Sequence, residues 1–473
     1  MNILHYFLGL PPFHSGGLMI YARDLAKEQQ KNGNNVIMLM PGRYKSVEKR
    51  SCIEFFKNIE GLPIYQITNA LPFSDVGISE PRKFMREIVD NDYEKFLSEK
   101  NIDIVHIHSL IGLPKEFVNA ATKLNIKSYF TSHDYFGLCP QIYLYNYNDE
   151  KCIDYKSGIE CVKCNTSCKS DTAILRRNRD FNNVFQLLRK VYQYSKLQDV
   201  YKLFSKLVGS RNVDLLVTNV HSNINSIEEL QISLGYKELR NYYIGILNSI
   251  DVLLFNSTIS KNEYGKYLEL ENRTYYVVPV THEKIKDNRD NKVDDIGENN
   301  RIHFGYMGYL DKKKGYVDLV KVLNEIKYEY SEWDISIYGD FSNVDISKFD
   351  RNYFIFKGRY AHNKLPEIFS GMDILIIPSK WKETFGFIGL EALSYGVPVM
   401  TSNNVGFSDL IIHDSNGVVY DDDIDNHHLH NALVDVIINR NSLMRYKKKI
   451  LSGDFTYHIE DHYKKIRDIY LLK

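Results

Sequence analysis

The feature that most limits the fold of this chain is the repeated alternation of short apolar runs with amphipathic segments. The run "MNILHYFL" leads into a glycine-containing loop, then a helical segment that ends at Gly33, then the apolar run "NNVIMLMPG". Within the helical segment Leu18, Ala22 and Leu25 recur at the spacing of one helix face. Strand, loop, helix and strand in this order predict a βαβ unit in a parallel sheet.

The alternation returns farther along the chain. The runs "IDIVHIHS" and "IKSYFTSHD" predict two more buried strands of the same region. A polar, charged segment is then followed by the apolar runs "IHFGYMGYL", "WDISIYGD", "YFIFKGR", "MDILIIPS" and "VPVMTSN", with helical patterns between them. We therefore expect two α/β domains, at residues 1–285 and 301–455, a linker at 286–300, and a C-terminal helix at 456–473.

Composition narrows the class of protein. The chain has 473 residues, of which 44% are apolar and 25% charged, the balance of a globular protein. Lys and Arg together number 60, and so do Asp and Glu, so the chain lacks the basic excess typical of a nucleic-acid binder. No apolar run approaches the roughly 18 residues of a membrane-spanning helix, and the N-terminus lacks the features of a signal peptide. We expect a cytoplasmic protein.

Two glutamates mark the segment "WKETFGFIGLEALSYGVPV", which follows the apolar run "DILIIPS". Glu383 lies in the predicted loop at the carboxyl end of that strand, and Glu391 lies on the helix that follows. Ligands of open α/β sheets bind at this end of the strands. Carboxylates there can accept hydrogen bonds from sugar and ribose hydroxyls, and the amides at the helix start can hold a diphosphate. A favourable charge at the helix start explains Glu383 but not Glu391.

Two glycine-containing loops offer further anion sites. Gly16 and Gly17 lie between a predicted strand and a helix, where glycine lets the backbone approach a ligand closely. A tight turn with no ligand explains this pair equally well. Lys314 and Gly315 occupy the same kind of position in "YMGYLDKKKGYVDLV", and a lysine there could neutralise a phosphate. Taken alone, the run of lysines is explained better by a solvated surface.

Together these segments resemble the retaining glycosyltransferases of family 4. The resemblance covers nearly the whole chain and is strongest in "PSKWKETFGFIGLEALSYGVPV", where seven residues separate the two glutamates. Also similar are "SGGLMIYARDLAKEQQKNGNNV", "DIVHIHS", "GYMGYLDKKKG" and "FKGRYAHNKLPEIFSGMDILIIPS". The resemblance implies an α/β architecture of the GT-B type, in which two Rossmann-like domains face each other across a cleft. The N-terminal domain would bind the acceptor and the C-terminal domain the nucleotide-sugar donor. The C-terminal helix at 456–473 could pack back on the N-terminal domain, as in similar proteins.

The family also implies roles for individual residues. Glu391 would bind the nucleotide ribose, Glu383 the hydroxyls of the donor sugar near the reacting carbon, and Lys314 the donor diphosphate. His133, in "TSHDYFGLCP", matches a histidine that lines the reaction site of such enzymes. The catalytic residues implied are His133 and Glu383, and the donor-binding residues are Gly16, Gly17, Lys314, Thr384, Phe385, Gly386 and Glu391. For His106 and His108 we favour a core or scaffolding role.

One position departs from the family pattern. Tyr309 stands where family members usually have an arginine, and a neutral phenol cannot replace a bidentate contact to phosphate. Lys312 or Lys313 could compensate for it.

No catalytic metal is expected. Lys314 and the amides of a helix start could stabilise a leaving diphosphate without Mg²⁺. The chain has no Asp-x-Asp pair in the position typical of metal-dependent transferases. The run from Asp421 to Asp423 is predicted to be a solvated loop.

Five of the six cysteines are clustered after the His133 segment, in a loop that resembles one kept by a subgroup of these transferases after an "HDYFGLCP" type of motif. In a reducing compartment such a cluster favours metal or redox chemistry over disulfides. Four thiolates can close a tetrahedral structural zinc site. The predicted ligands are Cys139, Cys152, Cys161 and Cys164, with Cys168 able to substitute. Unliganded thiols and redox pairs are the alternatives.

Residues 139–243 form a predicted insertion in the N-terminal domain, made of the cysteine-rich loop and a basic amphipathic region. The region from Arg176 to Arg211 could lie on an anionic membrane surface, and many similar enzymes act on lipid-linked acceptors. We favour the alternative, a helical insertion that packs on the first domain.

We therefore expect a metal-independent retaining glycosyltransferase that uses a nucleotide sugar to extend a glycan or lipid-linked acceptor in surface polysaccharide synthesis. It would bind no nucleic acid, and its membrane contact would be peripheral, at the inner face. The main alternative is a non-catalytic GT-B subunit that partners an active transferase, which Tyr309 favours. A glycogen synthase-like or phosphorylase-type enzyme is another, and free phosphate as acceptor would identify the phosphorylase. The neutral charge disfavours a zinc-dependent nucleic-acid binder.

Overall fold

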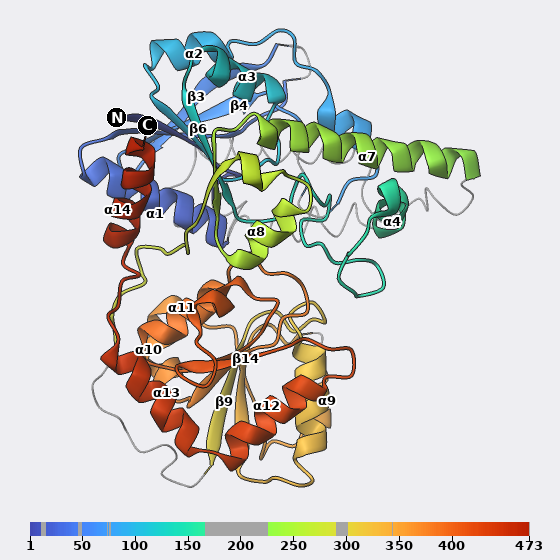
Figure 1. Ribbon diagram of the computed structural model, residues 1–473, viewed down its shortest axis with the longest axis vertical. Helices are drawn as coiled ribbons and strands as arrows, with labels where there is room; N and C mark the ends of the chain where they lie inside the picture. Colours follow the sequence, from blue (N-terminus) through green and yellow to red (C-terminus); the bar gives the residue numbers. More distant parts are fainter. Residues whose placement is uncertain are drawn as a thin grey trace. The chain divides into compact units, whose positions relative to one another are not determined.

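The chain folds into two compact units. The computed structural model describes residues 1–10, 16–45, 50–72, 74, 77–165, 226–289, 301–342 and 344–472. Unit 1 comprises Met1–Tyr147, Cys152–Phe255 and Glu263–Tyr276, and unit 2 comprises Asn148–Lys151, Asn256–Asn262 and Val277–Lys473. Figure 1 traces both units from the N-terminus to the C-terminus.

Unit 1 is built on an eight-stranded sheet with the order β3-β4-β2-β1-β5-β6-β7-β8. The strands are β1 (Asn2–Tyr6), β2 (Asn35–Pro41), β3 (Cys52–Ile59), β4 (Leu62–Thr68), β5 (Ile104–Ile107), β6 (Lys127–Ser132), β7 (Val252–Phe255) and β8 (Thr274–Val277). Neighbours from β4 to β7 pair in parallel, as predicted, whereas β3 pairs antiparallel with β4. The sequence analysis does not predict this edge hairpin.

The helices of the first part of the chain follow the predicted alternation. They are α1 (Gly17–Lys31), α2 (Tyr93–Glu99), α3 (Lys115–Lys123), α4 (Ile159–Cys164), α7 (Ser226–Asn248) and α8 (Thr258–Gly265), with short 3₁₀ turns η1 (Pro81–Met85) and η2 (Lys156–Gly158). Helix α1 confirms the predicted first helix: Ala22 and Leu25 on its inner face are fully buried, and Gly33 follows its end with φ +81°. A left-handed residue just past a helix end is a position that favours glycine.

Unit 2 contains a six-stranded sheet with the order β11-β10-β9-β12-β13-β14. The strands are β9 (Ile302–Met307), β10 (Trp333–Tyr338), β11 (Phe354–Gly358), β12 (Ile374–Ile377), β13 (Val399–Ser402) and β14 (Gly417–Tyr420). All five pairings are parallel. The four residues of β12 and of β13 are all buried, as expected of a parallel sheet covered on both faces.

Helices cover the unit 2 sheet and complete its core. They are α9 (Tyr316–Ile326), α10 (Leu365–Ser370), α11 (Phe387–Ser394), α12 (His427–Ile438), α13 (Asn441–Ser452) and α14 (Ile459–Leu471). Leu323 of α9 and Leu433 of α12 are fully buried in one cluster with Phe304 and Trp333 of the sheet. The 3.6-residue period of these helices therefore places one apolar stripe on the sheet.

Both sheets reverse their strand order at one point. In unit 1 the order runs outward from β1 on one side and from β5 on the other; in unit 2 it runs outward from β9 and from β12. Such a switch point leaves a crevice at the carboxyl ends of the two central strands, where ligands of this class of fold bind. The loops after these strands carry most of the predicted site residues.

Two predictions fall outside these observations. The basic segment from Arg176 to Arg211 and most of the predicted linker at 286–300 lie outside the described residues.

The predicted C-terminal helix is observed as α14, within unit 2. Among the helices that the structure describes, none is long and apolar enough to span a membrane.

Candidate functional site

A buried ion pair occupies the switch point of unit 2. Lys314, in the loop after β9, places its Nζ 2.6 Å from Oε1 of Glu383, in the loop after β12. The side chain of Glu383 is only 8% exposed, against 28% for Lys314. Because β9 and β12 are neighbours in the sheet, two residues far apart in the sequence meet. The pairing satisfies a carboxylate that would otherwise be costly to bury.

The Glu383 carboxylate is held in place by more than this lysine. The hydroxyl of Ser379 also donates to its Oε1, and its backbone N–H donates to the carbonyl of Asn404 at 2.8 Å. The Lys314 ammonium lies 5.3 Å from the ring centroid of Trp381, within range of a cation–π contact. Both charged groups are therefore positioned before any ligand arrives.

Two glycines allow the loops to close around the pair. Gly315 has φ +71°, and a Cβ there would lie 1.7 Å from the carbonyl oxygen of Pro378. Gly386 has φ +98°, and its Cβ would lie 2.8 Å from Cγ1 of Val405. Only glycine combines a left-handed backbone with so close an approach. These positions explain the Lys-Gly and Phe-Gly dipeptides of the sequence.

Helix starts adjoin the same loops. Helix α9 begins directly after Gly315 and α11 directly after Gly386. The first N–H groups of a helix have no acceptor within it and carry a partial positive charge. The flanking Thr384 and Phe385 are buried, at 6% and 2% exposed, so they support the loop. Lys314 and these helix starts together suit an anionic group.

Glu391 lies in the second turn of α11, with its side chain 15% exposed. Its Oε1 is 3.6 Å from Nε2 of His282 and 3.7 Å from Nε2 of His362. Neither histidine is predicted from the sequence, because neither is near Glu391 in sequence or carries a local motif. Burial lowers the pKa of His362, although the Glu391 charge opposes this shift. Glu391 is thus a partly shielded carboxylate flanked by two imidazoles.

The prediction that Asp421 to Asp423 form a solvated loop is wrong for Asp422. Its side chain is 9% exposed and accepts from the Lys380 ammonium at 2.7 Å and from Asn404 Nδ2 at 2.9 Å. Lys380 follows Ser379 in the Glu383 loop. Lys151 also pairs with Asp422, at 3.0 Å. Asp422 is buried because it compensates these two lysines, a pairing that composition alone does not reveal.

The position that departs from the family pattern is at the surface. Tyr309 is 74% exposed. Lys312 forms a surface ion pair with Asp149 at 2.8 Å, with side-chain exposures of 60% and 47%. The carbonyl of Lys313 accepts the N–H of Lys380 at 2.9 Å. Of the three lysines in this run, Lys314 is the one that reaches Glu383.

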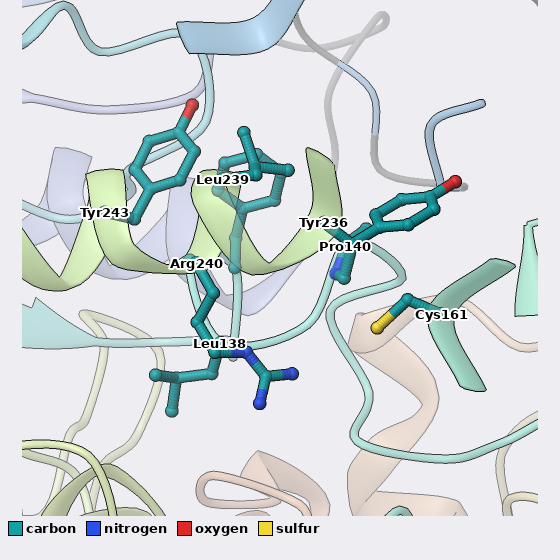
Figure 2. Close-up of a pocket in the computed structure, with 9 residues that line it drawn as sticks. Leu138, Pro140, Cys161, Tyr236, Leu239, Arg240 and Tyr243 are labelled. Atoms are coloured by element: carbon teal, nitrogen blue, oxygen red, sulfur yellow. The ribbon is translucent and has the colours of Figure 1, made fainter. Parts of the chain in front are cut away.

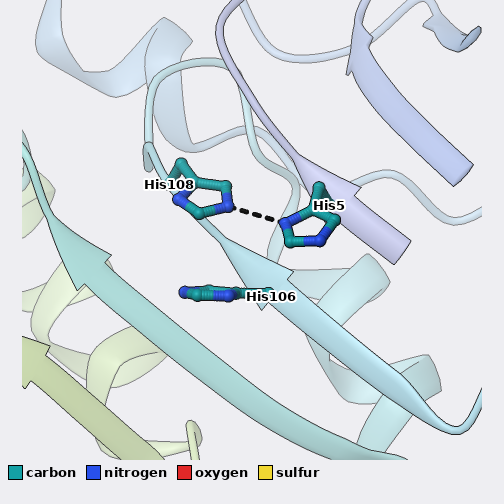
Figure 3. A group of neighbouring side chains, drawn as sticks. All are labelled: His5, His106 and His108. Carbon is teal, nitrogen blue, oxygen red and sulfur yellow. Dashed lines mark hydrogen bonds between the residues drawn. The ribbon is translucent and has the colours of Figure 1, made fainter. Parts of the chain in front are cut away.

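Histidines occupy the switch point of unit 1 (Figure 3). His5 on β1, His106 on β5 and His108 just after β5 are all at most 1% exposed. His5 Nε2 lies 2.7 Å from Oε1 of Gln29, and His5 Nδ1 lies 2.8 Å from Nε2 of His108. Because the Gln29 oxygen can only accept, His5 carries its proton on Nε2, and His108 donates to His5. The predicted core role of His106 and His108 agrees with this burial.

These three imidazoles have nitrogens within 4.8 Å of one another, a distance that a metal ion could bridge. The His106 and His108 rings, however, have centroids 4.2 Å apart and planes inclined by 33°. Two of these nitrogens, His5 Nδ1 and His108 Nε2, already share a hydrogen bond, and Nε2 of His106 lies 2.7 Å from the hydroxyl oxygen of Thr131. Burial lowers the pKa of His5 to about 4 and that of His108 well below its ordinary value. We interpret the group as a stack of buried, hydrogen-bonded imidazoles, in which burial favours the neutral forms of His5 and His108.

Of the remaining predicted site residues of unit 1, His133 adjoins this stack, whereas Gly16 and Gly17 lie at the start of α1. Gly16 precedes α1 with φ +139°, which favours glycine. The half-buried His133 follows β6, with its ring centroid 4.9 Å from that of Tyr21 and 5.6 Å from that of His108. The predicted residues thus divide between the units: Gly16, Gly17 and His133 lie in unit 1, and Lys314, Glu383, Thr384, Phe385, Gly386 and Glu391 lie in unit 2.

The four thiols predicted to bind zinc lie in unit 1. Cys139 and Cys152 belong to the loop after β6, and Cys161 and Cys164 are one turn apart on α4. Burial raises the pKa of Cys152 to about 11 and raises the pKa of Cys161 well above its ordinary value. The neighbouring Cys139 thiol adds to both shifts. In the part of the chain that the structure describes, only the three histidines have ligand atoms all within 4.8 Å. The thiols therefore share one neighbourhood without the spacing of a closed site, and Cys168 lies outside the described residues.

Two family models match this chain. Residues 288–451 match the model described as "Glycosyl transferases group 1". Residues 15–151 match the model described as "Glycosyltransferase Family 4". The first match contains Lys314, Glu383 and Glu391, and the second contains Gly16 and His133.

Curated relatives also align with parts of this chain. An uncharacterized 41.2 kDa protein in the cps region of Klebsiella pneumoniae is 31% identical over 129 residues, which are 27% of this chain and 34% of that protein. The uncharacterized glycosyltransferase MJ1607 of Methanocaldococcus jannaschii is 22% identical over 413 residues, which are 86% of this chain and 82% of that protein. The chain thus aligns with about a third of the first relative and most of the second.

The fold has solved counterparts. HepE from Anabaena, in complex with UDP, superimposes with a TM-score of 0.55 at 13% identity, over 99% of each chain. This likeness and the two parallel-sheet units establish the GT-B fold. Together with the two family matches, they support glycosyltransferase function for this chain.

Proposed function

We propose that this glycosyltransferase transfers a sugar from a nucleotide-sugar donor with retention of anomeric configuration, and that unit 2 binds the donor. The observation that carries the proposal is the buried Lys314–Glu383 pair at the switch point. A diphosphate is an anion that can share the Lys314 ammonium with Glu383, and sugar hydroxyls are donors that Glu383 can accept from. Glu391, with its second oxygen available to ribose hydroxyls, would complete the donor site.

The proposed contribution of these residues to catalysis is electrostatic. When the bond between the anomeric carbon and the phosphate breaks, negative charge develops on the leaving diphosphate. Lys314 and the first amides of α9 and α11 are positioned to stabilise that charge. Such groups do the work that Mg²⁺ does in metal-dependent transferases, so we propose a metal-independent reaction. His133 and Glu383 are the residues that we propose to line the reacting carbon.

The acceptor is proposed to be a glycan or a lipid-linked glycan, bound through unit 1 near Gly16 and Gly17. The Klebsiella pneumoniae relative belongs to a cps region, which supports a role in surface polysaccharide synthesis. We propose that the enzyme acts in the cytoplasm, with peripheral contact to the inner face of the membrane.

A structural zinc ion is proposed for the cysteine-rich loop. Cys139, Cys152, Cys161 and Cys164 supply four soft thiolate donors in one neighbourhood, a donor set that suits zinc. When bound, zinc would cross-link the loop after β6 to α4. It would take no part in sugar transfer, because thiolate-rich sites of this kind are closed.

Thermal unfolding of the whole protein with UDP, GDP, ADP and their sugar conjugates tests the donor site. A ligand at about 100 times its dissociation constant adds about 2.7 kcal/mol to stability, which shifts the melting temperature by several degrees. We expect one nucleotide to stabilise the wild type but not Glu391→Ala. The control is Glu367→Ala, which removes a surface glutamate of α10 that is 75% exposed and should keep the shift.

A second candidate is a non-catalytic GT-B subunit that partners an active transferase. It is favoured by Tyr309, exposed where the family pattern has a phosphate-binding arginine. The absence of any nucleotide-dependent shift in folded, zinc-replete protein would select this candidate.

A further inference from the structure

Glu391 is flanked by two histidines that approach the same one of its oxygens. Nε2 of His282 lies 3.6 Å from Oε1 of Glu391, and Nε2 of His362 lies 3.7 Å from it. Both distances are slightly longer than a hydrogen bond. In the described part of the chain, Nδ1 of His282 and Nε2 of His362 are buried without a hydrogen-bond partner. Because buried polar atoms nearly always have a partner, these two nitrogens require an explanation.

Arg240 on α7 offers a contrast in unit 1. Its residue is 4% exposed, its Nη1 donates to the hydroxyl of Tyr267 at 3.0 Å, and its guanidinium carbon lies 3.4 Å from the ring centroid of Tyr155. The cavity that Arg240 lines with Cys161 (Figure 2) has a volume of about 10 Å³, room for about one water molecule and for no nucleotide. This buried group is therefore satisfied by the protein itself, unlike the two imidazole nitrogens of unit 2.

The fold of unit 2 brings both imidazoles to one face of α11. Phe387 and Glu391 are four residues apart on this helix and share that face. The ring of His282 packs on Phe387, with centroids 5.2 Å apart. His362 begins the short 3₁₀ turn η5 (His362–Lys364), and its ring centroid lies 6.3 Å from that of His282, with the planes inclined by 69°. Two segments far apart in the sequence thus meet at one carboxylate.

The shared contact with Oε1 has a consequence for the other oxygen. The last torsion of a glutamate is soft, so an unrestrained carboxylate would present either oxygen to a ligand. We propose that His282 and His362 are positioning residues for Glu391, which hold its Oε1 so that Oε2 accepts hydrogen bonds from the ribose hydroxyls of the donor. The proposal rests on the donor site proposed above, and it adds that the two imidazoles make this site select ribose over deoxyribose.

The test is the preference for ribose, measured by titration calorimetry on the full-length protein. UDP, GDP and ADP are each compared with their 2′-deoxy and 3′-deoxy forms. We expect wild type to bind one ribonucleotide at least about tenfold more tightly than its deoxy forms, because each deoxy form lacks a hydrogen bond to a charged group. In His282→Leu and in His362→Leu this ratio should fall below about threefold.

Two further variants separate positioning from packing. His282→Gln keeps an N–H donor and should hold the ratio within about threefold of wild type. His303→Leu removes a histidine near the amino end of β9, whose Nδ1 lies 2.9 Å from Oδ1 of Asp334, and should leave the ratio unchanged. Since the side chain of His362 is 36% exposed, His362→Leu supplies the test if the more deeply buried His282→Leu fails to fold.

Three results would overturn the proposal. Leucine variants that weaken the binding of ribose and deoxyribose nucleotides by the same factor would assign the histidines to packing. A Gln variant that loses the ratio as fully as the Leu variant would show that no N–H donor is needed. Wild-type protein that binds nucleotides without distinguishing the sugars would show that Glu391 does not contact ribose. In all three cases nucleotide binding survives, whereas a protein that binds none of the nucleotides would also lose the proposed donor site.

Discussion

The two sheets reverse their strand order in the same manner but place different chemistry at the reversal. In unit 1 the residues there are His5, His106 and His108, buried imidazoles that bond to one another or to uncharged partners. Burial lowers the pKa of His5 and of His108, which favours their neutral forms. In unit 2 they are Lys314 and Glu383, a charged pair in a short contact. One architecture thus supports both a neutral hydrogen-bonded stack and an ion pair.

The difference follows from what each residue type can do when it leaves water. An imidazole can release its proton and stay buried as a neutral donor and acceptor. Lysine and glutamate keep their charges when they face each other, so their burial requires a partner. Unit 1 should therefore respond to acid, and unit 2 should respond to anions. The side chains at each switch point, and not the shared fold, determine whether a unit is expected to respond to acid or to anions.

The largest expected effect breaks the ion pair of unit 2. Lys314→Met should lower kcat/KM for sugar transfer by about 10²–10³, because it removes the cation facing the leaving diphosphate. Lys312→Met, which breaks only a surface ion pair, should change kcat/KM by less than about threefold. Steady-state kinetics with the donor found by thermal shift would measure both. Equal losses in the two variants would contradict the assignment of Lys314.

The next effect concerns the glycine that lets the Lys314 loop approach β12. Gly315→Ala should lower the free energy of unfolding by about 3 kcal/mol, because its Cβ would meet the carbonyl of Pro378 at 1.7 Å and its φ is left-handed. Gly371→Ala is the matched control, since the nearest atom to its Cβ would be 3.6 Å away. Denaturant unfolding would compare the two. A loss in Gly315→Ala no larger than in the control would show that the loop relaxes freely.

The acid response of unit 1 is expected to be smaller. The pKa of His5 falls from 6.5 to about 4 on folding, so its contribution to stability is full above pH 6.5 and is lost as the pH falls toward 4. From pH 7 to pH 5 this amounts to about 2 kcal/mol. His108, with its pKa also lowered, adds to the loss in the same direction.

His5→Gln should remove this part of the pH dependence, whereas His427→Gln, at an exposed position of unit 2, should leave it intact. Urea unfolding at pH 7, 6 and 5 would measure the difference. A wild-type curve as flat as that of His5→Gln would show that the imidazole stack stays solvated or charged.

The smallest expected effect concerns Tyr309, which stands where the family pattern has an arginine. Tyr309→Arg should raise kcat/KM by about five- to tenfold, roughly 1 kcal/mol, because an arginine at this exposed position can reach a phosphate with a charged donor. The side chain is 74% exposed, so the change should leave stability within about 0.5 kcal/mol. A fall in activity would show that the phenol has a role of its own.

Much of the fold was readable because its signals are local. Alternating apolar runs and helical periods predicted the parallel sheets and α1, and the glycine after α1 predicted its end. The edge hairpin of β3 and β4 was missed, because its strands are amphipathic and one face is solvated, so no apolar run marks them. Asp422 was misjudged because an acidic run looks solvated until its lysine partner is known.

What the sequence determined by itself is the set of parts: two α/β units, the loops with Lys314 and the two glutamates, and a cluster of thiols. These are set by residue type and by spacing within one strand or helix. The tertiary structure alone decided which parts meet. Lys314 meets Glu383, which is 69 positions away in the sequence, and His282 and His362 both approach Glu391. A buried charge needs a partner close to it in space. The spacing of residues along the chain does not reveal which residue that partner is.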